Sequence, residues 1–248
     1  MNILRKLFKK ETKSNQPIDS DNYNFIGKTK WESLEDLLEQ NAGLSFEKQL
    51  IFAELIGENP WQFDMKKGTI SFGNTFEFPV QVIGSLSFNN NSWMWGWANS
   101  KSGIPENLLK QAYKLKEIGE EKQITEFIEG HFMVEEGFEH KIGLMACGLF
   151  QSKSYYCANY GQGTLIVTLD SDEIPVVETN GLEKISTSFS QLISSIELNH
   201  KNTFKNYLID RGFKLKIEEN EIEGLKDGKH IKGEFDQSSR LINLSGKL

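Results

Sequence analysis

The feature that most constrains the fold is a stretch in which apolar side chains occupy every second position. From Phe76 to Phe88, the even positions hold apolar residues or glycine, and the odd positions are mostly polar or small. A period of two over this length predicts a long β-strand with one buried face. Pro79 lacks a backbone donor, so we expect a sheet edge or a bulge nearby.

Two shorter strands are expected on either side of this long strand. Residues 69–73 alternate apolar with polar side chains and lead into a Gly-Asn turn. Residues 92–98 follow the polar run Asn-Asn-Asn and carry tryptophan at every second position. Strands joined by short polar turns pair as hairpins, so the sequence predicts an antiparallel sheet here.

Trp93, Trp95 and Trp97 are expected to share one face of their strand, because they lie two residues apart. Pairing across the preceding turn places Gly84 opposite Trp97, where a glycine leaves room for an indole ring. One interpretation is a tryptophan-rich core. The other is an aromatic wall for a flat or sugar-like ligand. The apolar strand partners favour the core.

Helices are predicted wherever apolar residues lie three and four apart. Gly43 and Ser45 are predicted to separate two short helices, as the stop of the first and the cap of the second. Later helices are expected at 105–119, 124–130, 136–151 and, as a pair, 182–212; further strands are expected at 155–160, 164–169 and 213–246.

These elements predict an α+β fold, in which a curved antiparallel sheet is covered by helices and followed by a C-terminal helical pair and a small antiparallel β meander. We expect three segments. Residues 1–28 form a basic amphipathic leader with a polar linker, residues 29–170 form the core domain with the tryptophan strand, and residues 181–248 form the helical hairpin with the meander.

Charge and cysteine usage limit the location and the partners. A formal net charge of -7 does not attract phosphate backbones, so a protein partner is expected and nucleic acid is not. Cys147 and Cys157 are too few for a disulfide-stapled secreted scaffold, which favours a cytoplasmic protein with reduced thiols.

No signal peptide or membrane span is expected. Weak contact between residues 1–10 and a membrane surface is an alternative. The oligomeric state is not indicated.

Side chains with metal-ligand chemistry gather in one stretch, at His131, Glu135, Glu136, Glu139 and His140. Glu136 and His140 lie four residues apart, on one side of a predicted helix. Acidic residues in a first helical turn are also explained by the helix dipole, and the stretch has no second copy as a di-iron site requires. We therefore predict no metal site and no cofactor.

A ligand-binding interpretation of the aromatic strand defines a candidate site of five residues. Trp61 and Asp64 flank the first strand, Trp95 and Trp97 supply the wall, and Asn99 follows it with an amide that orients a ligand. The simpler interpretation is that Asp64 forms a turn and Asn99 caps the next one.

Four segments together resemble a bacterial family of unknown function. They are residues 61–64 (Trp-Gln-Phe-Asp), residues 68–72 (Gly-Thr-Ile-Ser-Phe), residues 83–84 (Ile-Gly) and above all residues 92–99 (Ser-Trp-Met-Trp-Gly-Trp-Ala-Asn). Members of that family carry a Trp-x-Trp-x-Trp-Ala-Asn strand after such a hairpin, then a helix with a Gly-Glu turn, which Gly119-Glu120 matches. The resemblance covers roughly residues 45–170 and, more loosely, the helical hairpin and meander expected after residue 180. It implies fold boundaries and no activity.

The sequence therefore predicts a cytoplasmic binding or interaction protein without catalysis, comparable by analogy with immunity proteins. A small-molecule binder that uses the tryptophan wall is the main alternative. A metal-dependent enzyme that uses His131, Glu136 and His140 is the third hypothesis.

Overall fold

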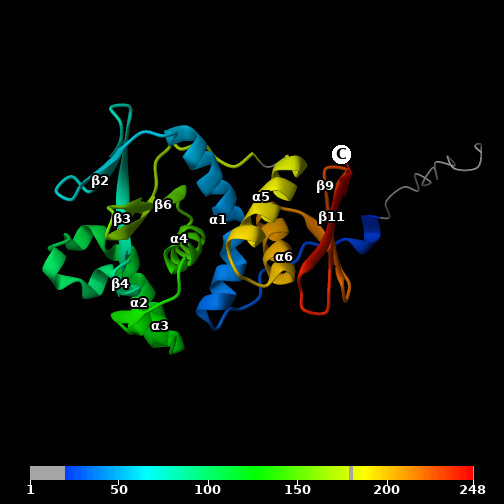
Figure 1. The fold of residues 1–248 in the computed structure, drawn as a ribbon. Coiled ribbons are helices and arrows are strands. Elements are labelled where there is room, and N and C mark those ends of the chain that lie inside the picture. Colours follow the sequence, from blue (N-terminus) through cyan, green and yellow to red (C-terminus); the bar gives the residue numbers. More distant parts are fainter. Residues whose placement is uncertain (1–19, 179–180, 248) are drawn as a thin grey trace, which may run out of the picture.

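The computed structural model describes residues 20–178 and 181–247. Across Figure 1, a seven-stranded antiparallel sheet is followed by α4 (Phe138–Leu149), by α1 (Leu34–Ile56), by the pair α5 (Leu182–Ser195) and α6 (His200–Asp210), and finally by a four-stranded antiparallel sheet. This arrangement confirms the predicted α+β class. The predicted leader at residues 1–10 lies outside the described residues.

The larger sheet is built around one long strand, β3. Strand β2 pairs with the beginning of β3, β4 pairs with its end, and β7 pairs with it from Val80 to Ser87. The strands of this sheet are β1 (Trp61–Asp64), β2 (Thr69–Phe72), β3 (Phe76–Ser87), β4 (Ser92–Trp95), β5 (His131–Met133), β6 (Ser154–Asn159) and β7 (Gly163–Leu169).

Strand β3 confirms the long strand but does not keep one buried face. Its register with β7 shifts between Val82 and Gly84, which marks a β-bulge. Before the shift, Val80 and Val82 belong to an apolar cluster around Phe52 of α1. After the shift, Leu86 belongs to a second cluster, which contains the tryptophans of β4. The prediction that all even-numbered side chains point inward together is therefore wrong, because one extra residue changes the alternation.

Strand β4 is shorter than predicted. It ends at Trp95, and Trp97 lies in the 3₁₀ helix η2 (Gly96–Ala98). The register places Gly84 opposite Trp95 rather than opposite Trp97. The space above Gly84 is occupied by Trp93, whose ring would overlap a Cβ atom added at that glycine. Trp93 and Trp95 are fully buried, which confirms the core interpretation for these two residues.

Helix α1 is continuous over 23 residues, so the predicted division into two helices is wrong. Its N-cap is Ser33, whose side chain accepts a hydrogen bond from the backbone of Asp36. Gly43 does not end the helix. A Cβ atom there would overlap the side chain of Tyr207 on α6, so glycine allows the two helices to approach closely. Ser45, the predicted cap, is buried inside α1.

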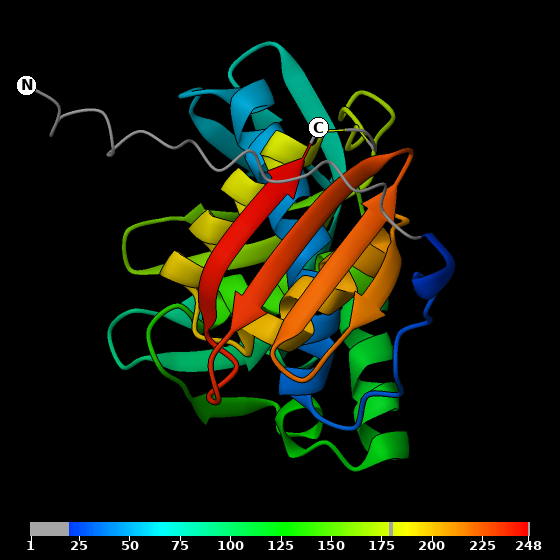
Figure 2. The same ribbon diagram turned by 90° about the vertical axis from the view of Figure 1, so that its right-hand side faces the viewer.

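The small sheet confirms the predicted meander. One of its faces packs against α5 and α6, and Figure 2 shows the other face. One apolar cluster runs from the tryptophans of β4 through α1 to Phe189 of α5 and Phe235 of the small sheet. The remaining elements are β8 (Lys214–Ile217), β9 (Glu221–Lys226), β10 (Lys229–Phe235), β11 (Leu241–Lys247), α2 (Lys110–Lys122), α3 (Thr125–Ile128), η1 (Ser20–Asn22), η3 (Ser100–Ser102) and η4 (Glu106–Leu108).

The predicted helix at 105–119 is divided into η4 and α2, and the helix predicted from residue 136 begins at Phe138. None of the helices within residues 20–178 and 181–247 has the length and apolarity needed to cross a membrane.

Candidate functional site

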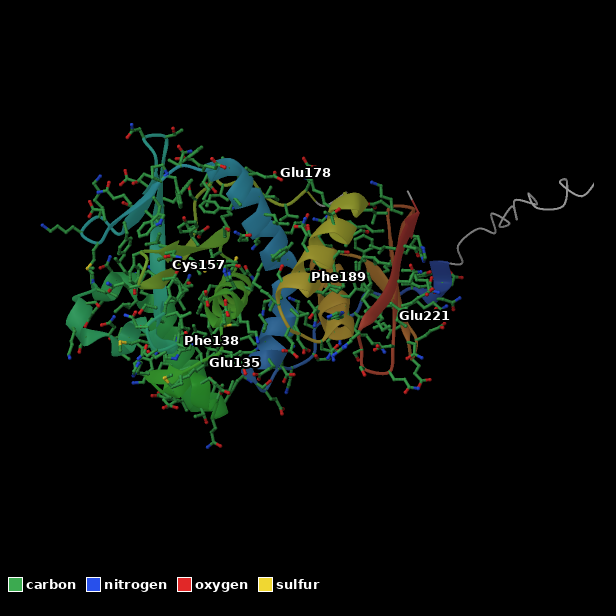
Figure 3. All side chains as sticks on the ribbon, viewed as in Figure 1. Glu135, Phe138, Cys157, Glu178, Phe189 and Glu221 are labelled. Carbon is green, nitrogen blue, oxygen red and sulfur yellow. The ribbon has the colours of Figure 1, made fainter. Side chains whose placement is uncertain are left out.

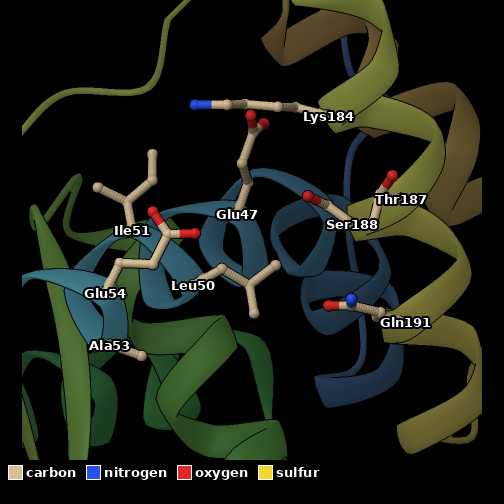
Figure 4. A pocket seen from close by; sticks show the side chains of 9 residues that line it. All are labelled: Glu47, Leu50, Ile51, Ala53, Glu54, Lys184, Thr187, Ser188 and Gln191. Atoms are coloured by element: carbon tan, nitrogen blue, oxygen red, sulfur yellow. The ribbon is translucent and has the colours of Figure 1, made fainter. Parts of the chain in front are cut away.

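A cavity of about 590 Å³ lies between α1 and α5 (Figure 4). Its volume is in the range of small-molecule sites, which is about 300–1,000 Å³. Helix α1 lines one wall and α5 lines the other. The lining residues are Glu47, Leu50, Ile51, Ala53 and Glu54 from α1, and Lys184, Thr187, Ser188 and Gln191 from α5.

One residue that lines the cavity, Glu47, forms a buried ion pair with Arg211. The side chains of Glu47 and Arg211 are 2% and 1% exposed. Arg211 Nη1 donates to Glu47 Oε1 at 2.9 Å and to Oε2 at 2.8 Å, and the Tyr207 hydroxyl donates to Oε2 at 2.6 Å. Arg211 Nη2 also donates to the carbonyl of Gly181 at 3.3 Å. Buried charges persist when they are paired and hydrogen-bonded, as these are.

Tyr207 connects the ion pair to the cavity wall. Burial raises the pKa of Tyr207 well above its ordinary value, and the Glu47 carboxylate raises it further. The phenol therefore stays protonated and remains a donor to Glu47. It is also hydrogen-bonded to Ser188, which is 5% exposed and lines the cavity from α5. The network thus joins α6, α1 and α5.

The cavity also has one unpaired charge on each wall. Lys184 extends from α5, and Glu54 extends from α1. Both side chains are exposed, and neither forms an ion pair with another residue in the part of the chain that the structure describes. Opposite charges on opposite walls suit a molecule that itself carries a cation and an anion.

Two of the sequence-predicted ligand residues lie on the edge strand β1. Asp64 Oδ1 accepts hydrogen bonds from the backbone N–H groups of Lys66 at 2.9 Å and Lys67 at 3.0 Å. Hydrogen bonding by Lys67 in particular lowers the pKa of Asp64. These contacts confirm the turn-forming interpretation of Asp64. Trp61 is partly buried at the other end of β1.

The other three predicted residues lie at the opposite end of that sheet. Trp95 is fully buried, and its Nε1 donates to the carbonyl of Glu126 at 2.8 Å. Trp97 is partly buried, with Lys116 Nζ 4.6 Å from its ring centre. Asn99 ends η2 through its backbone N–H rather than its side chain. The structure does not bring the five predicted residues together, because the sheet separates β1 from β4.

The predicted metal candidates are also dispersed. His131 lies on β5, Glu136 precedes α4, and His140 lies in the first turn of α4. Within the described ranges, no group of three His, Cys, Asp or Glu side chains is arranged to hold a metal ion.

His140 instead contacts a cysteine that the sequence did not connect with it. His140 Nδ1 lies 3.7 Å from Sγ of Cys157 on β6 (Figure 3). Burial raises the pKa of Cys157 strongly, and the nearby Glu139 carboxylate raises it further. Burial also raises the pKa of Cys147 to about 11, and Cys147 is buried as predicted. Both thiols therefore remain protonated at neutral pH.

Sequence reasoning missed Glu47, Lys184, Tyr207 and Arg211. One signal in the sequence pointed to Arg211. Arg211 is one of three arginines in a chain that otherwise uses lysine for its cations, and arginine is the residue suited to a buried, bidentate ion pair. Its partner lies 164 residues away, so no local pattern identifies the pair.

A family model matches residues 35–172, which include α1 but neither α5 nor α6. The cavity thus combines one wall inside the matched segment with one wall outside it. No curated protein and no solved structure matches the chain. The match confirms the resemblance to a family of unknown function and covers more than half of the sequence. The chain belongs to the Family of unknown function (DUF6882).

Proposed function

We propose that this chain is a binding protein without catalysis, which holds a small zwitterionic molecule between α1 and α5. The observation that carries the proposal is the cavity with Lys184 on one wall and Glu54 on the other, above the buried Glu47–Arg211 pair. We propose the bacterial cytoplasm as its location, because free cysteines are typical of that reducing compartment. An immunity-protein-like role, in which the chain binds a protein partner, is a separate hypothesis that does not use this cavity.

The two charged walls support a ligand with an ammonium group and an anionic group. Lys184 attracts a carboxylate or phosphate, and Glu54 attracts an ammonium. Leu50, Ile51 and Ala53 supply apolar surface between these charges for the rest of the ligand. A few polar groups in a partly apolar cavity orient a small molecule, as binding sites commonly do.

The buried network supports binding rather than chemistry. Both carboxylate oxygens of Glu47 already accept hydrogen bonds from Arg211 or Tyr207, so this group is occupied as an ion-pair partner and is not poised as a general base. Tyr207 stays neutral, because burial and then the Glu47 carboxylate raise its pKa well above the ordinary value. The hydrogen-bonded Glu47 carboxylate instead helps to hold the cavity walls in place.

Isothermal titration calorimetry with a panel of free amino acids tests the proposal, with the matching amino acid amides as probes that lack the carboxylate. We expect at least one amino acid to bind with a Kd below about 1 mM, and its amide to bind about tenfold more weakly, since one charge-assisted contact is lost.

Two variants identify the site. Lys184→Met should weaken binding of the amino acid about tenfold. Glu58→Gln removes an exposed charge just beyond the end of α1, outside the cavity lining, and should leave the Kd unchanged. The proposal fails if no member of the panel binds, or if the two variants weaken binding equally.

A further inference from the structure

We infer that the edge of the larger sheet at β5 is a docking site for an extended, basic segment of a protein partner. The site lies in the lower part of the molecule in the view of Figure 3, where Glu135 and Phe138 are labelled, and away from the small sheet, where Glu221 is labelled. This inference is independent of the proposed ligand cavity between α1 and α5.

The first observation is an open strand edge. Among the strands that the structure describes, β5 pairs with β4 alone. The hydrogen bonds from Trp95 N to Gly130 O at 3.1 Å and from Val134 N to Asn91 O at 2.8 Å set the pattern of this ladder. In an antiparallel ladder the bonded pairs alternate, so Phe132 directs its backbone groups toward β4.

The backbone N–H and C=O groups of His131 and Met133 consequently point away from β4. No other described residue forms a hydrogen bond with these groups. Both residues are exposed, and the Met133 side chain is 67% exposed. An unpaired edge of this kind is a template for an added strand.

The second observation is a groove beside that edge. It has a volume of about 280 Å³, which accommodates a side chain of a bound segment. Its apolar surface comes from Leu34, Phe132, Met133, Val134 and Phe138. In strand addition, main-chain hydrogen bonds supply affinity, and pockets for alternate side chains supply specificity.

The third observation is the charge around the groove. Four carboxylates line it, those of Glu35, Glu126, Glu135 and Glu136, against one cation, Lys141. Within residues 20–178 and 181–247, none of the four forms an ion pair. A partner segment with lysine or arginine beside an apolar residue complements this groove in charge and in shape.

The same charge argues against two copies of the chain that meet groove to groove. The chain carries a formal net charge of -7, so two copies that met at this acidic groove would repel each other. A basic segment of a different protein is favoured by the long-range field as well as by the local contacts.

Fluorescence anisotropy tests the inference with a labelled peptide of alternating lysine and valine. The comparison peptides alternate glutamate with valine, and lysine with serine. At low salt we expect a Kd for the lysine-valine peptide on the order of 10 µM, and binding at least tenfold weaker for each of the others. Equal binding of the lysine-valine and glutamate-valine peptides overturns the inference.

Met133→Pro tests the strand edge. Proline removes an outward N–H that the β4 ladder does not use, and edge strands tolerate proline at such positions. We expect the affinity for the lysine-valine peptide to fall about tenfold while the thermal unfolding midpoint is retained. An unchanged affinity in the folded variant overturns the strand-addition mode.

A matched pair of triple variants tests the local charge. Glu126→Gln, Glu135→Gln and Glu136→Gln together remove three charges from the groove, and should weaken peptide binding about tenfold. Glu218→Gln, Glu219→Gln and Glu221→Gln remove the same net charge from the small sheet, and should change the affinity less than about twofold. Equal losses in both variants overturn the inference, because they show attraction to net charge alone.

Discussion

The tryptophan hairpin of β3 and β4 and the junction of α1 with α6 both hold large side chains out of water, but they do so with opposite chemistry. Trp93 and Trp95 are fully buried and meet edge to face with their ring centres 5.2 Å apart. Glu47 and Arg211 are equally buried but charged. Apolar burial stabilises a fold by about 25 cal/mol per Å². A buried ion pair contributes little net stability and is costly to break.

The difference shows that burial alone does not identify a core. The hairpin is apolar, so the burial of its rings is expected to stabilise the fold. The junction places a carboxylate and a guanidinium where only one relative position of α1 and α6 satisfies both. We therefore expect the hairpin to stabilise the fold and the junction to specify how the C-terminal helices dock beside the cavity.

The largest effect is expected from removing an indole of the hairpin. Trp95→Ala should reduce the free energy of unfolding by about 4–5 kcal/mol, because a buried ring is lost and the carbonyl of Glu126 loses its donor. Urea unfolding measures this change. Trp61→Ala on the edge strand β1 is the control and should cost much less, since Trp61 is only partly buried. A similar cost for both variants would contradict the core assignment.

Breaking the ion pair from one side should be almost as costly. Arg211→Met leaves the Glu47 carboxylate buried without its cation, and should reduce the free energy of unfolding by about 3–4 kcal/mol. The double variant Glu47→Leu, Arg211→Met removes both charges and should cost clearly less than the sum of the two single variants. Additive costs in this double-mutant cycle would show that the pair is not coupled.

A smaller effect should follow from adding one methyl group between α1 and α6. Gly43→Ala forces a Cβ atom against Tyr207 and should cost about 1–3 kcal/mol by overpacking. Gly27→Ala, whose added Cβ meets no atom within 4 Å, is the control and should be nearly neutral. If Gly43→Ala is also neutral, the two helices are not held as closely as the junction requires.

The smallest effect is expected from a partly buried charge network on the small sheet, which is compared with the fully buried junction. The Tyr23 hydroxyl donates to Glu223 Oε2 at 2.6 Å, and His230 Nε2 lies 2.7 Å from the same oxygen. Burial alone would raise the pKa of Glu223, but hydrogen bonds from Tyr23 and His230, with Lys216 nearby, hold it below its ordinary value of 4.5.

A carboxylate with a lowered folded-state pKa stabilises the fold above its ordinary pKa, and this stabilisation is lost as the pH falls through the folded-state pKa. Glu223→Gln should therefore cost about 1 kcal/mol at pH 7, and the cost should disappear as the pH is lowered below 4.5. Urea unfolding of both proteins at pH 7 and pH 3 measures this. A cost that is independent of pH would assign the effect to packing.

Most of the fold could be predicted from local patterns. Alternation identified the long strand β3, helical spacing identified α5 and α6, and turn residues identified the small sheet. The errors occurred where a single residue had two interpretations. Gly43 resembles a helix stop, but it is a contact with α6. The bulge before Gly84 exchanges the two faces of β3. A strict alternation of apolar and polar residues cannot predict such an extra residue.

The sequence by itself determined the fold class, most of the elements and an acidic chain with two free thiols, because these depend on neighbouring residues and on composition. Only the tertiary structure decided the candidate sites. Glu47 meets Arg211 across 164 residues, and the edge at β5 is open because no further strand of the described residues pairs with it. Such contacts depend on how distant segments pack, and patterns among neighbouring residues do not predict that packing.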